Sequence, residues 1–304
     1  MNSLWAKTET IEARPALDGD RNTDVLIIGA GMAGVLCAYF LKKAGVDGLV
    51  VEAEKIGMGI TKNTTAKITC QHGLIYSDLI RKSSVEKAWQ YLYANELALE
   101  KFREICQGVD CDFEEKPAYI YSTTDRDVIE DEVAALEKLG YPAAFAADIP
   151  LPFKIAGAIR FDHQAQFHPL KFMAAIAKEL PICENTRVKK VSGNTAYTDR
   201  GNIHAKKIII ASHFPFIDSH GFYFVKMYQQ RSYVLALKGA KDVGGMYLDE
   251  RENGLSFRNH GDLLLLGGRG HRTGKQGVGY DELRYFARKY YPAAKEQYAW
   301  ATQD

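Results

Sequence analysis

Three glycines and one glutamate carry the clearest chemical pattern in this 304-residue chain. Gly29, Gly31 and Gly34 follow the spacing G-x-G-x-x-G, and Glu52 comes 23 residues after Gly29. In this pattern the first glycine permits a tight turn, the second lets the backbone approach a pyrophosphate, and the third lets a helix pack closely. An acidic residue at about this offset is of the kind that holds a ribose hydroxyl.

The residues around these glycines predict the strand–turn–helix–strand unit that such a site requires. An apolar run at 25–28 is typical of a buried strand, and a second run at 49–51 ends in Glu52. Between them we expect a helix that runs to about residue 44 and stops at Gly45. The order predicts a dinucleotide site at the N-terminus of this helix. The Glu52 carboxylate would repel a 2′-phosphate, which disfavours NADP, whereas FAD and NAD both stay open.

Composition bounds the class of protein. The length favours about two domains, and 46% hydrophobic with 25% charged residues is ordinary for a globular protein. A net charge of +1 gives no basic surface for nucleic acid, no apolar run reaches the roughly 18 residues of a membrane span, and the polar N-terminus has no secretory signal. We therefore expect a cytoplasmic protein with no membrane or nucleic-acid partner. The five cysteines form no C-x-x-C pair and no cluster with zinc or iron–sulfur spacing, so no metal is predicted.

The order of elements after Glu52 favours a flavoprotein over a classical NAD dehydrogenase. A threonine- and glycine-rich loop follows Glu52 and offers N–H and hydroxyl groups to an anion, although a solvated linker is the competing interpretation. Ser83 and Glu86 form a capping-box pattern at a helix start. Other helices are expected at about 124–140, 169–180 and 280–290, strands at 113–122, 158–161, 187–191, 195–198, 203–211, 233–237, 246–248, 255–257 and 263–266, and a basic glycine-rich loop at 267–274. A nucleotide domain interrupted by an inserted substrate sheet fits this order.

Several stretches together resemble the D-amino-acid oxidase/glycine oxidase superfamily of FAD-dependent oxidoreductases. They are the glycine signature with Glu52, residues 59–73 (GITKNTTAKITCQHG), residues 164–169 (QAQFHP), Arg231-Ser232-Tyr233, and Gly267-Gly268 with His271. The narrower resemblance is to the bacterial subgroup that often carries a C-terminal Rieske domain. The pair of Rieske ligand motifs, C-x-H with C-x-x-H, does not occur in this chain.

The resemblance implies an α/β fold with an α+β insert. A Rossmann-like FAD-binding domain would be interrupted by a mixed β-sheet substrate domain, as in two-domain flavoproteins of the glutathione-reductase type. We assign residues 1–110, 156–215 and 275–304 to the FAD-binding domain, with its C-terminal part truncated. Residues 111–155 and 216–274 would form the substrate domain over the flavin.

The resemblance also implies which residues bind FAD. The glycine turn would hold the pyrophosphate, Glu52 the adenosine ribose, and the backbone of Val188 the adenine. The stretch 61–67 would wrap the ribityl chain and the flavin edge, although Lys62 stands where the family often has glycine. The full set is Gly29, Gly31, Met32, Ala33, Gly34, Glu52, Ala53, Thr61, Thr64, Thr65, Ala66, Lys67, Val188, Ala211 and Ser212.

Four residues are candidates for catalysis: Arg258, Tyr233, His271 and Lys67. For an amine substrate a hydride passes from the carbon that bears nitrogen to flavin N5, and the imine hydrolyses in water, so no protein nucleophile is needed. An arginine fork suits a substrate carboxylate, and we prefer Arg258 because it follows a predicted strand. Tyr233 would line the pocket, and Lys67 or His271 would place positive charge near the reduced flavin.

Two other arginines, Arg231 and Arg269, are alternatives for the carboxylate, and an ion pair is the competing interpretation for each arginine. The sequence thus predicts an FAD-dependent oxidoreductase that oxidises a C–N bond of a small amine or amino acid. An NAD-dependent dehydrogenase and a non-catalytic, truncated flavin-binding protein are the alternatives. A second copy of the chain or an electron-acceptor protein is a further candidate partner. The family continues past the equivalent of Trp300 with a strand and helix that close over the flavin, so we expect a shortened chain with weak FAD binding and low turnover.

Overall fold

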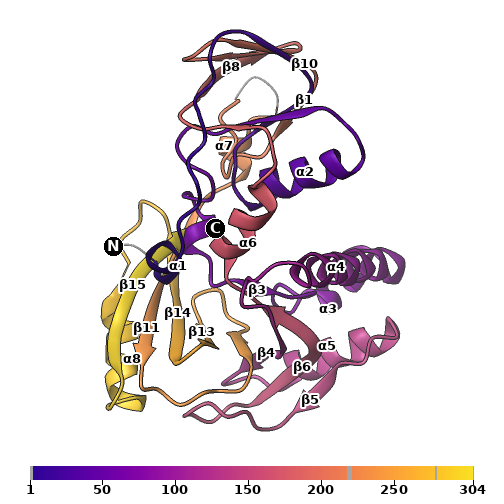
Figure 1. Ribbon diagram of the computed structural model, residues 1–304. Helices are drawn as coiled ribbons and strands as arrows, with labels where there is room; N and C mark the ends of the chain where they lie inside the picture. Colours follow the sequence, from indigo (N-terminus) through magenta and orange to yellow (C-terminus); the bar gives the residue numbers. More distant parts are fainter. Residues whose placement is uncertain (1–2, 218–220, 278, 304) are drawn as a thin grey trace. The chain divides into compact units, whose positions relative to one another are not determined.

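The computed structural model describes residues 3–217, 221–277 and 279–303. Residues 1–2, 218–220, 278 and 304, which fall within the predicted domain ranges, lie outside the described residues. The described chain divides into two compact units, each built around one sheet (Figure 1). The six-strand unit comprises residues 3–64 and 168–229, and the nine-strand unit comprises residues 65–167 and the chain from Gln230 onward. The functional domain ranges given above stay a prediction.

The six-strand unit has the strand order β7-β2-β1-β10-β9-β8. The first four of these strands run parallel, and β9 and β8 continue from β10 as an antiparallel extension. Its strands are β1 (Arg21–Ile28), β2 (Gly48–Val51), β7 (Ile182–Cys183), β8 (Val188–Ser192), β9 (Thr195–Thr198) and β10 (Asn202–Ile210). Its helices are α1 (Leu4–Thr8), α2 (Met32–Lys43), the 3-10 turn η1 (Thr61–Asn63), α6 (Pro169–Ala177) and α7 (Tyr223–Lys226). This is the Rossmann-like part of the fold.

The nine-strand unit has the order β15-β11-β14-β13-β12-β4-β6-β3, and β5 pairs with β6. Its strands are β3 (Lys67–Ile68), β4 (Glu114–Ser122), β5 (Ala144–Ala146), β6 (Gly157–Gln166), β11 (Gln230–Lys238), β12 (Met246–Asp249), β13 (Leu255–His260), β14 (Leu263–Arg272) and β15 (Lys295–Gln303). Its helices are α3 (Tyr76–Lys82), α4 (Val85–Cys106), α5 (Asp127–Lys138) and α8 (Tyr280–Tyr290). Strands β4 and β11 to β14 lie in one sheet, as predicted despite the sequence gap between them.

The sheet of the nine-strand unit is made of two chain segments that meet at one seam. The segment before residue 168 contributes β3 to β6, and the segment after residue 229 contributes β11 to β15. At the seam β4 pairs with β12 in parallel, with Met246 opposite Ala118 and Asp249 opposite Tyr121. The other paired strands described in this sheet are antiparallel.

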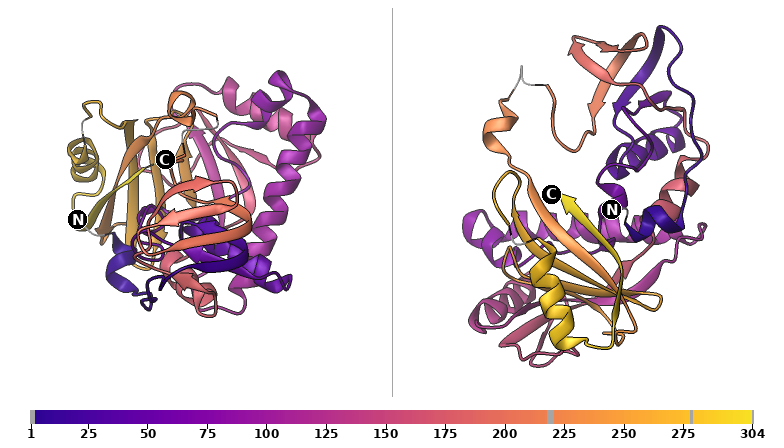
Figure 2. Two further views of the ribbon diagram at one scale, coloured as in Figure 1. Left: turned by 90° about the horizontal axis from the view of Figure 1, so that it is seen from above. Right: turned by 90° about the vertical axis from the view of Figure 1, so that its left-hand side faces the viewer.

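Two hydrophobic cores pack against this sheet, one on each face. Helix α8 lies along the sheet (Figure 2), and its Leu283 and Ala287 pack with apolar side chains of β11, β13 and β14 and with Tyr121 of β4. Ala88 and Leu92 of α4 pack with residues of α5 and with Ile120 and Ile159 of the sheet. Because successive side chains of a strand point to opposite faces, Ile120 and Tyr121 belong to different cores.

Residues 267–272 form strand, and the loop predicted there from the glycines is wrong. Strand β14 continues through them to Arg272. A Cβ atom on Gly268 would lie 2.1 Å from the carbonyl oxygen of Gly254, and one on Gly267 would lie 2.8 Å from Ser256 Oγ. These glycines therefore permit the close approach of β13 rather than a turn.

Helix α4 starts one residue later than the capping-box pattern predicts. Ser84, not Ser83, is the N-cap, and its hydroxyl oxygen accepts the Lys87 N–H at 3.2 Å. The predicted Ser83–Glu86 capping box is wrong for this reason. Glu86 instead lies in the first turn of the helix, where a negative charge is favourable.

We expect Ser84→Ala to lower the free energy of unfolding by about 1 kcal/mol, because it removes the acceptor at the start of α4. Urea unfolding followed by circular dichroism measures the change. Ser83→Ala is the matched control and should shift stability by less than about 0.5 kcal/mol. An equal loss in both variants would contradict the assignment of the cap to Ser84.

Candidate functional site

The glycine turn after β1 is built so closely that only glycine fits at two of its positions. Gly29 has a positive φ of 108°, and its N–H donates to the carbonyl oxygen of Val51 at 2.8 Å. A Cβ atom on Gly29 would lie 2.9 Å from the carbonyl oxygen of Ala211, and one on Gly34 would lie 1.9 Å from the carbonyl oxygen of Gly29. A Cβ atom on Gly31 would lie 3.6 Å from Thr61 Oγ1, which is an ordinary contact, so packing does not require a glycine there.

The turn leads directly into the N-terminus of α2. Gly31 is the N-cap, and the N–H of Met32 donates to Thr61 Oγ1 at 3.0 Å. Ala33 follows in the first turn and is exposed. The first N–H groups of a helix have no partner within it and attract negative charge. The start of α2, together with the Thr61 hydroxyl, is therefore a place for an anionic group such as a phosphate.

Glu52 lies beside this turn, at the end of β2. Its Oε2 accepts the Ala30 N–H at 2.8 Å, and its Oε1 accepts the Glu54 N–H at 2.9 Å. Ala53 follows, half-buried, between the two glutamates. Each carboxylate oxygen carries a second lone pair, so Glu52 can hold the turn and still accept hydroxyl groups of a sugar.

Two more predicted residues, Ala211 and Ser212, lie at the same edge. The N–H of Ala211, just after β10, donates to the carbonyl oxygen of Ile28 at 2.9 Å, and Ser212 Oγ donates to the carbonyl oxygen of Phe214 at 3.0 Å. Val188 starts β8, in the antiparallel part of the sheet, and two residues before it the N–H of Thr186 donates to the carbonyl oxygen of Glu52 at 2.8 Å. In open α/β sheets ligands bind at the carboxyl ends of the parallel strands, which is where Ala211 and Ser212 lie.

The stretch from Thr61 to Lys67 is divided between the two units. Thr61 and Thr64 belong to the six-strand unit, and Thr65, Ala66 and Lys67 begin the nine-strand unit. Ala66 has a positive φ of 55°, which only a few per cent of residues other than glycine adopt.

In the nine-strand unit the structure brings Lys67 and Arg258 together. Arg258 is fully buried, and its Nη1 donates to the carbonyl oxygen of Ala66 at 2.8 Å across 192 residues of sequence. Lys67 is half-buried, and its Nζ donates to Thr65 Oγ1 at 3.3 Å. Burial lowers the pKa of Lys67 to about 7, with a further contribution from the positive charge of Arg258. Burial also lowers the pKa of Arg258, to about 9, and the nearby Glu114 opposes that change.

The other two catalytic candidates, Tyr233 and His271, also contact each other. The Tyr233 hydroxyl and His271 Nε2 are 2.9 Å apart, and the rings stack with centroids separated by 5.8 Å. His271 Nδ1 lies 3.0 Å from the carbonyl oxygen of Arg272. A carbonyl oxygen can only accept, so in the neutral ring Nδ1 carries the proton and the Tyr233 hydroxyl donates to Nε2.

The two pairs lie on opposite faces of the sheet. Tyr233 packs on the core under α8 and meets Tyr280 of that helix, whereas Arg258 follows Phe257 of that core and so points to the other face. Arg258 pairs with Leu265 of β14. His271 follows Leu265 by six residues on the same strand, which places it roughly 20 Å from Leu265 at about 3.3 Å per residue. The structure therefore does not bring the four candidates into one cluster.

The alternative arginines and one further tyrosine have other surroundings. Arg269 Nε lies 2.8 Å from Glu282 Oε2, and Arg231 is exposed. Tyr247 stacks on Tyr119 and donates to the carbonyl oxygen of Val243 at 2.8 Å. Of the three arginines, Arg258 is the buried one beside a second cation.

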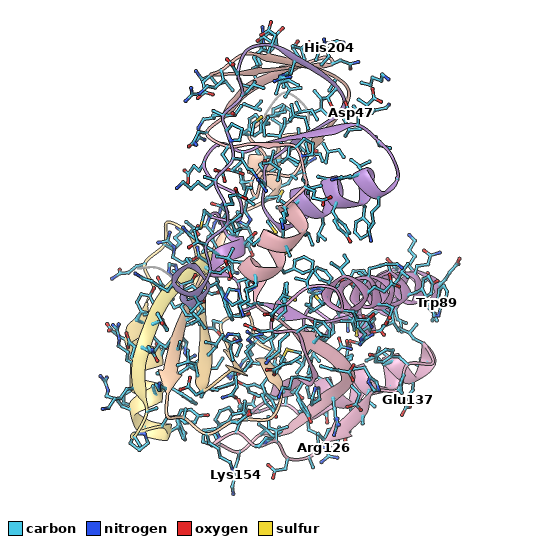
Figure 3. All side chains as sticks on the ribbon, in the orientation of Figure 1. Asp47, Trp89, Arg126, Glu137, Lys154 and His204 are labelled. Atoms are coloured by element: carbon cyan, nitrogen blue, oxygen red, sulfur yellow. The ribbon has the colours of Figure 1, made fainter. Side chains whose placement is uncertain are left out.

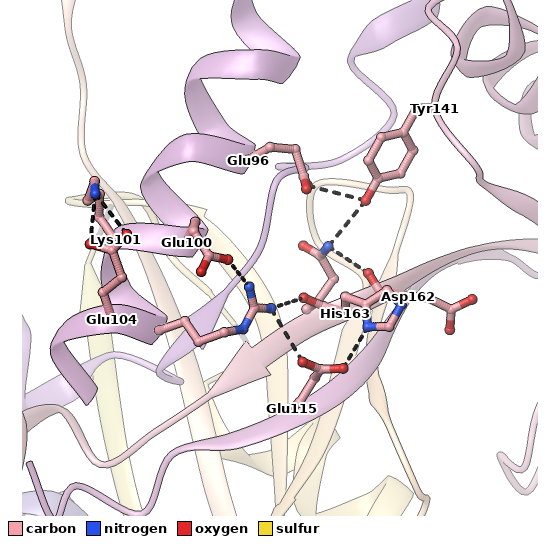
Figure 4. A network of polar contacts seen from close by, with 10 residues as sticks. Glu96, Glu100, Lys101, Glu104, Glu115, Tyr141, Asp162 and His163 are labelled. Atoms are coloured by element: carbon pink, nitrogen blue, oxygen red, sulfur yellow. Dashed lines mark hydrogen bonds and ion pairs between the residues drawn. The ribbon is translucent and has the colours of Figure 1, made fainter. Parts of the chain in front are cut away.

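The glutamines of the 164–169 motif tie β6 to its neighbours. Gln164 accepts the Cys70 N–H at 2.7 Å and donates to the carbonyl oxygen of Asp162, and the Tyr141 hydroxyl next to it donates to Glu96 at 3.2 Å (Figure 4). Gln166 donates to the carbonyl oxygen of Asn259 at 2.8 Å. This motif therefore supports both the segment that carries Lys67 and the strand that carries Arg258.

Sequence reasoning singled out neither Gln71 nor the specific role of Thr61. Gln71 is buried, and among the described residues its Oε1 has no hydrogen-bond partner. The stretch 59–73 contains both residues, but its composition does not distinguish the side chains that become buried from the exposed ones.

The structure now allows a comparison with known proteins. A model of the FAD dependent oxidoreductase family matches residues 24–302, a span that includes the glycine turn, Glu52, Lys67 and Arg258. The chain belongs to this family. FAD is the cofactor of the family, and the resemblance inferred from the sequence is confirmed. The narrow turn at Gly29 and Gly34, the start of α2 and the Glu52 carboxylate fit the pyrophosphate and ribose of FAD.

One relative is 35% identical over 323 residues: the putative Rieske 2Fe-2S iron-sulfur protein YhfW of Bacillus subtilis (strain 168). The match covers 99% of this chain and 64% of that protein, so the chain spans slightly less than two thirds of the relative's length.

Solved flavoproteins share the fold at low sequence identity. L-proline dehydrogenase from P. horikoshii gives a TM-score of 0.72 at 18% identity, and glycine oxidase from Geobacillus kaustophilus gives 0.68 at 18% identity. Each match covers 93% of this chain and 82% of the other chain. L-amino acid deaminase from Proteus vulgaris gives 0.70 at 12% identity, over 97% of this chain and 85% of the other. The predicted α/β flavoprotein fold class is confirmed.

None of the described helices is long and apolar enough to cross a membrane. In the same part of the chain, no three or more His, Cys, Asp or Glu side chains are grouped so that they could hold a metal ion.

We expect Glu52→Ala to weaken FAD binding by about 1.5–3 kcal/mol, the range for a hydrogen bond with a charged group. This corresponds to roughly a 10- to 150-fold rise in Kd, measured by titration followed by flavin fluorescence. The variant also removes the acceptor for the Ala30 N–H, which loosens the turn. Glu54→Ala, which removes an exposed carboxylate two residues away, should bind FAD as the unchanged chain does. Unchanged affinity in Glu52→Ala would reject the role of Glu52.

The lowered pKa of Lys67 predicts a dependence of stability on pH. Between about pH 7 and 10.5 the unfolded chain holds this proton and the folded chain does not. The free energy of unfolding therefore rises with pH across this window, and the buried charge destabilises the fold most below pH 7.

Lys67→Met should remove this dependence. At pH 6 we expect the FAD-free variant to be more stable than the unchanged chain by roughly 2–4 kcal/mol, and the difference should vanish toward pH 10. Urea unfolding at pH 6, 8 and 10 measures it. Lys189→Met, at an exposed lysine, is the control and should show no pH-dependent difference. A constant difference between Lys67→Met and the unchanged chain at all three pH values would overturn the assignment.

Proposed function

We propose that this chain oxidises a C–N bond of a small amine that carries a carboxylate, that is, an amino acid. The observation that carries the proposal is the pair of cations Lys67 and Arg258, held beside the strained Ala66 in a member of the FAD dependent oxidoreductase family. The planar guanidinium of Arg258 suits a substrate carboxylate, and Lys67 beside it adds positive charge whenever it is protonated. The names of two similar structures, a proline dehydrogenase and a glycine oxidase, agree with an amino-acid substrate.

The chemistry that FAD would supply when bound is hydride transfer, from the substrate carbon that bears nitrogen to the flavin. The six-strand unit would hold the nucleotide half of FAD, through the Gly29–Gly34 turn for the pyrophosphate and Glu52 for the ribose. The nine-strand unit would supply the groups that bind substrate. Arg258 stays charged at neutral pH even with its lowered pKa, so its guanidinium can pair with a carboxylate.

Lys67 has the chemistry of a proton acceptor. An alkylammonium ion has no lone pair on nitrogen, so it has to lose a proton before the neighbouring carbon can be oxidised. With a pKa of about 7, Lys67 is partly neutral at physiological pH, and its Nζ can take up that proton. We assign no step to Tyr233 and His271, whose catalytic roles stay predictions from the sequence.

A non-catalytic flavin-binding protein is the second candidate. The chain spans 64% of its Bacillus relative, so this match assigns neither an activity nor an electron acceptor to the chain. Oxidation of an added substrate in the absence of oxygen separates the two candidates, because a protein that only binds flavin keeps its absorbance near 450 nm.

The experiment compares substrates with and without a carboxylate. The FAD-loaded chain is mixed anaerobically with proline or glycine, and separately with pyrrolidine or methylamine, and flavin bleaching is followed. We expect bleaching by at least one amino acid and at least a roughly 100-fold smaller rate constant for its amine partner, since a lost charge-paired contact removes about 3 kcal/mol.

Arg258→Met should remove this preference, lowering the rate for the amino acid without a matching loss for the amine. Arg258→Lys keeps the charge and serves if the methionine variant does not fold, and it should restore part of the preference. Arg160→Met, which breaks a surface ion pair with Asp162, is the control. Bleaching by no amine, or an equal loss for both substrates in Arg258→Met, would contradict the proposal.

A further inference from the structure

Helix α4 carries an exposed apolar stripe on its outer side. Its members are four residues apart along the 22-residue helix: Val85, Trp89, Tyr93 and Leu97. They are 46%, 48%, 56% and 48% exposed, respectively, and Trp89 lies on the outward side of the helix (Figure 3). We call this set the α4 stripe. Single exposed apolar residues are ordinary on protein surfaces, but a contiguous row on one helix is typical of an interaction site.

The helix that carries the stripe is held firmly from its other side. Ala88 and Leu92 are buried in the core that includes α5 and the sheet, and Leu99 is buried farther along. The rings of Trp89 and Tyr93 stack with centroids 5.2 Å apart and planes 8° from parallel. The two aromatic rings therefore form a preorganised platform, and Trp and Tyr are the residues most enriched in the centres of protein interfaces.

The stripe is complementary to itself. Read along the helix, it is aliphatic, aromatic, aromatic, aliphatic, so reversing its direction gives the same pattern. We propose that the α4 stripe is the contact between two copies of this chain. The two α4 helices would be antiparallel, and the two-fold axis would cross the stripe midway between Trp89 and Tyr93. Trp89 of one copy would then meet Tyr93 of the other, and Val85 would meet Leu97. A two-fold interface requires such a self-complementary surface, and rows four residues apart favour a helix crossing of about −50°.

The area of the stripe sets the strength of the contact. A Trp or Tyr side chain buries about 150–250 Å² in full, so the half-exposed side chains of the stripe offer on the order of 300–400 Å² per copy. A stable interface buries about 800 Å² per partner. The expected dimer is therefore weak, and its population depends on protein concentration.

Sedimentation velocity of the FAD-loaded chain between about 1 and 300 µM tests the proposal, and we expect a shift from monomer to dimer in this range. Trp89→Glu and Tyr93→Glu should each raise the dimer Kd by at least roughly 30-fold without changing the thermal unfolding midpoint. Tyr285→Glu is the matched control, since Tyr285 is an equally exposed aromatic residue on α8 and should leave the dimer intact. Acrylamide quenching gives a second measurement, because Trp5 and Trp300 are buried and Trp89 is the exposed one of the three tryptophans.

Two outcomes would overturn the proposal. A chain that stays monomeric up to about 300 µM does so and leaves the stripe to a different partner. A dimer that both Trp89→Glu and Tyr93→Glu leave intact also does so, because the interface then lies elsewhere.

Discussion

The arrangement of the six-strand unit depends on one close approach between two pieces of backbone. At Gly34 the first turn of α2 packs against the carbonyl of Gly29, and the end of β10 packs against Gly29 from the other side. No side chain fits in either place. Because α2 is held this close, its first N–H groups, the Thr61 hydroxyl and the Glu52 carboxylate all face the carboxyl edge of the parallel strands. The places that we propose for the pyrophosphate and the ribose thus depend on the absence of a side chain at Gly29 and Gly34.

In the nine-strand unit the comparable constraint is the burial of Arg258. Its guanidinium bonds to the carbonyl of Ala66 and so joins β13 to the segment that begins with Thr65. Gln166 makes a second link of the same kind, to the carbonyl of Asn259. These two bonds hold Lys67 in its buried place beside a like charge, and burial first and the charge of Arg258 second lower the pKa of Lys67. The lowered pKa therefore comes from long-range contacts, not from the neighbours of the lysine in the sequence.

The sequence predicted what depends on local spacing and missed what depends on distant partners. The glycine turn, α2, the end of β2 and α8 follow from patterns within about 30 residues, and they lie where they were expected. Gly267 and Gly268 were misjudged because a glycine that admits a neighbouring strand looks the same in sequence as a glycine in a turn. The separation of Tyr233 and His271 from Arg258 could not be predicted, since the face of a residue depends on the register and irregularities of β11, β13 and β14. Burial of Lys67 likewise depends on the packing of its segment against β13, which carries Arg258.

The parallel seam between β4 and β12 has a consequence for how the chain is made. The edge of β4 that pairs with β12 has no partner until residue 246 has left the ribosome, about 125 residues later. Throughout that interval the first half of the sheet presents an open strand edge, which is the surface on which misassembly starts. The six-strand sheet is also incomplete at that stage, because β10 has to be synthesised before β1 gains its second neighbour. The six-strand sheet is therefore complete only after residue 210 and the nine-strand sheet only with β15, at residues 295–303, so neither sheet is finished during the first two thirds of synthesis.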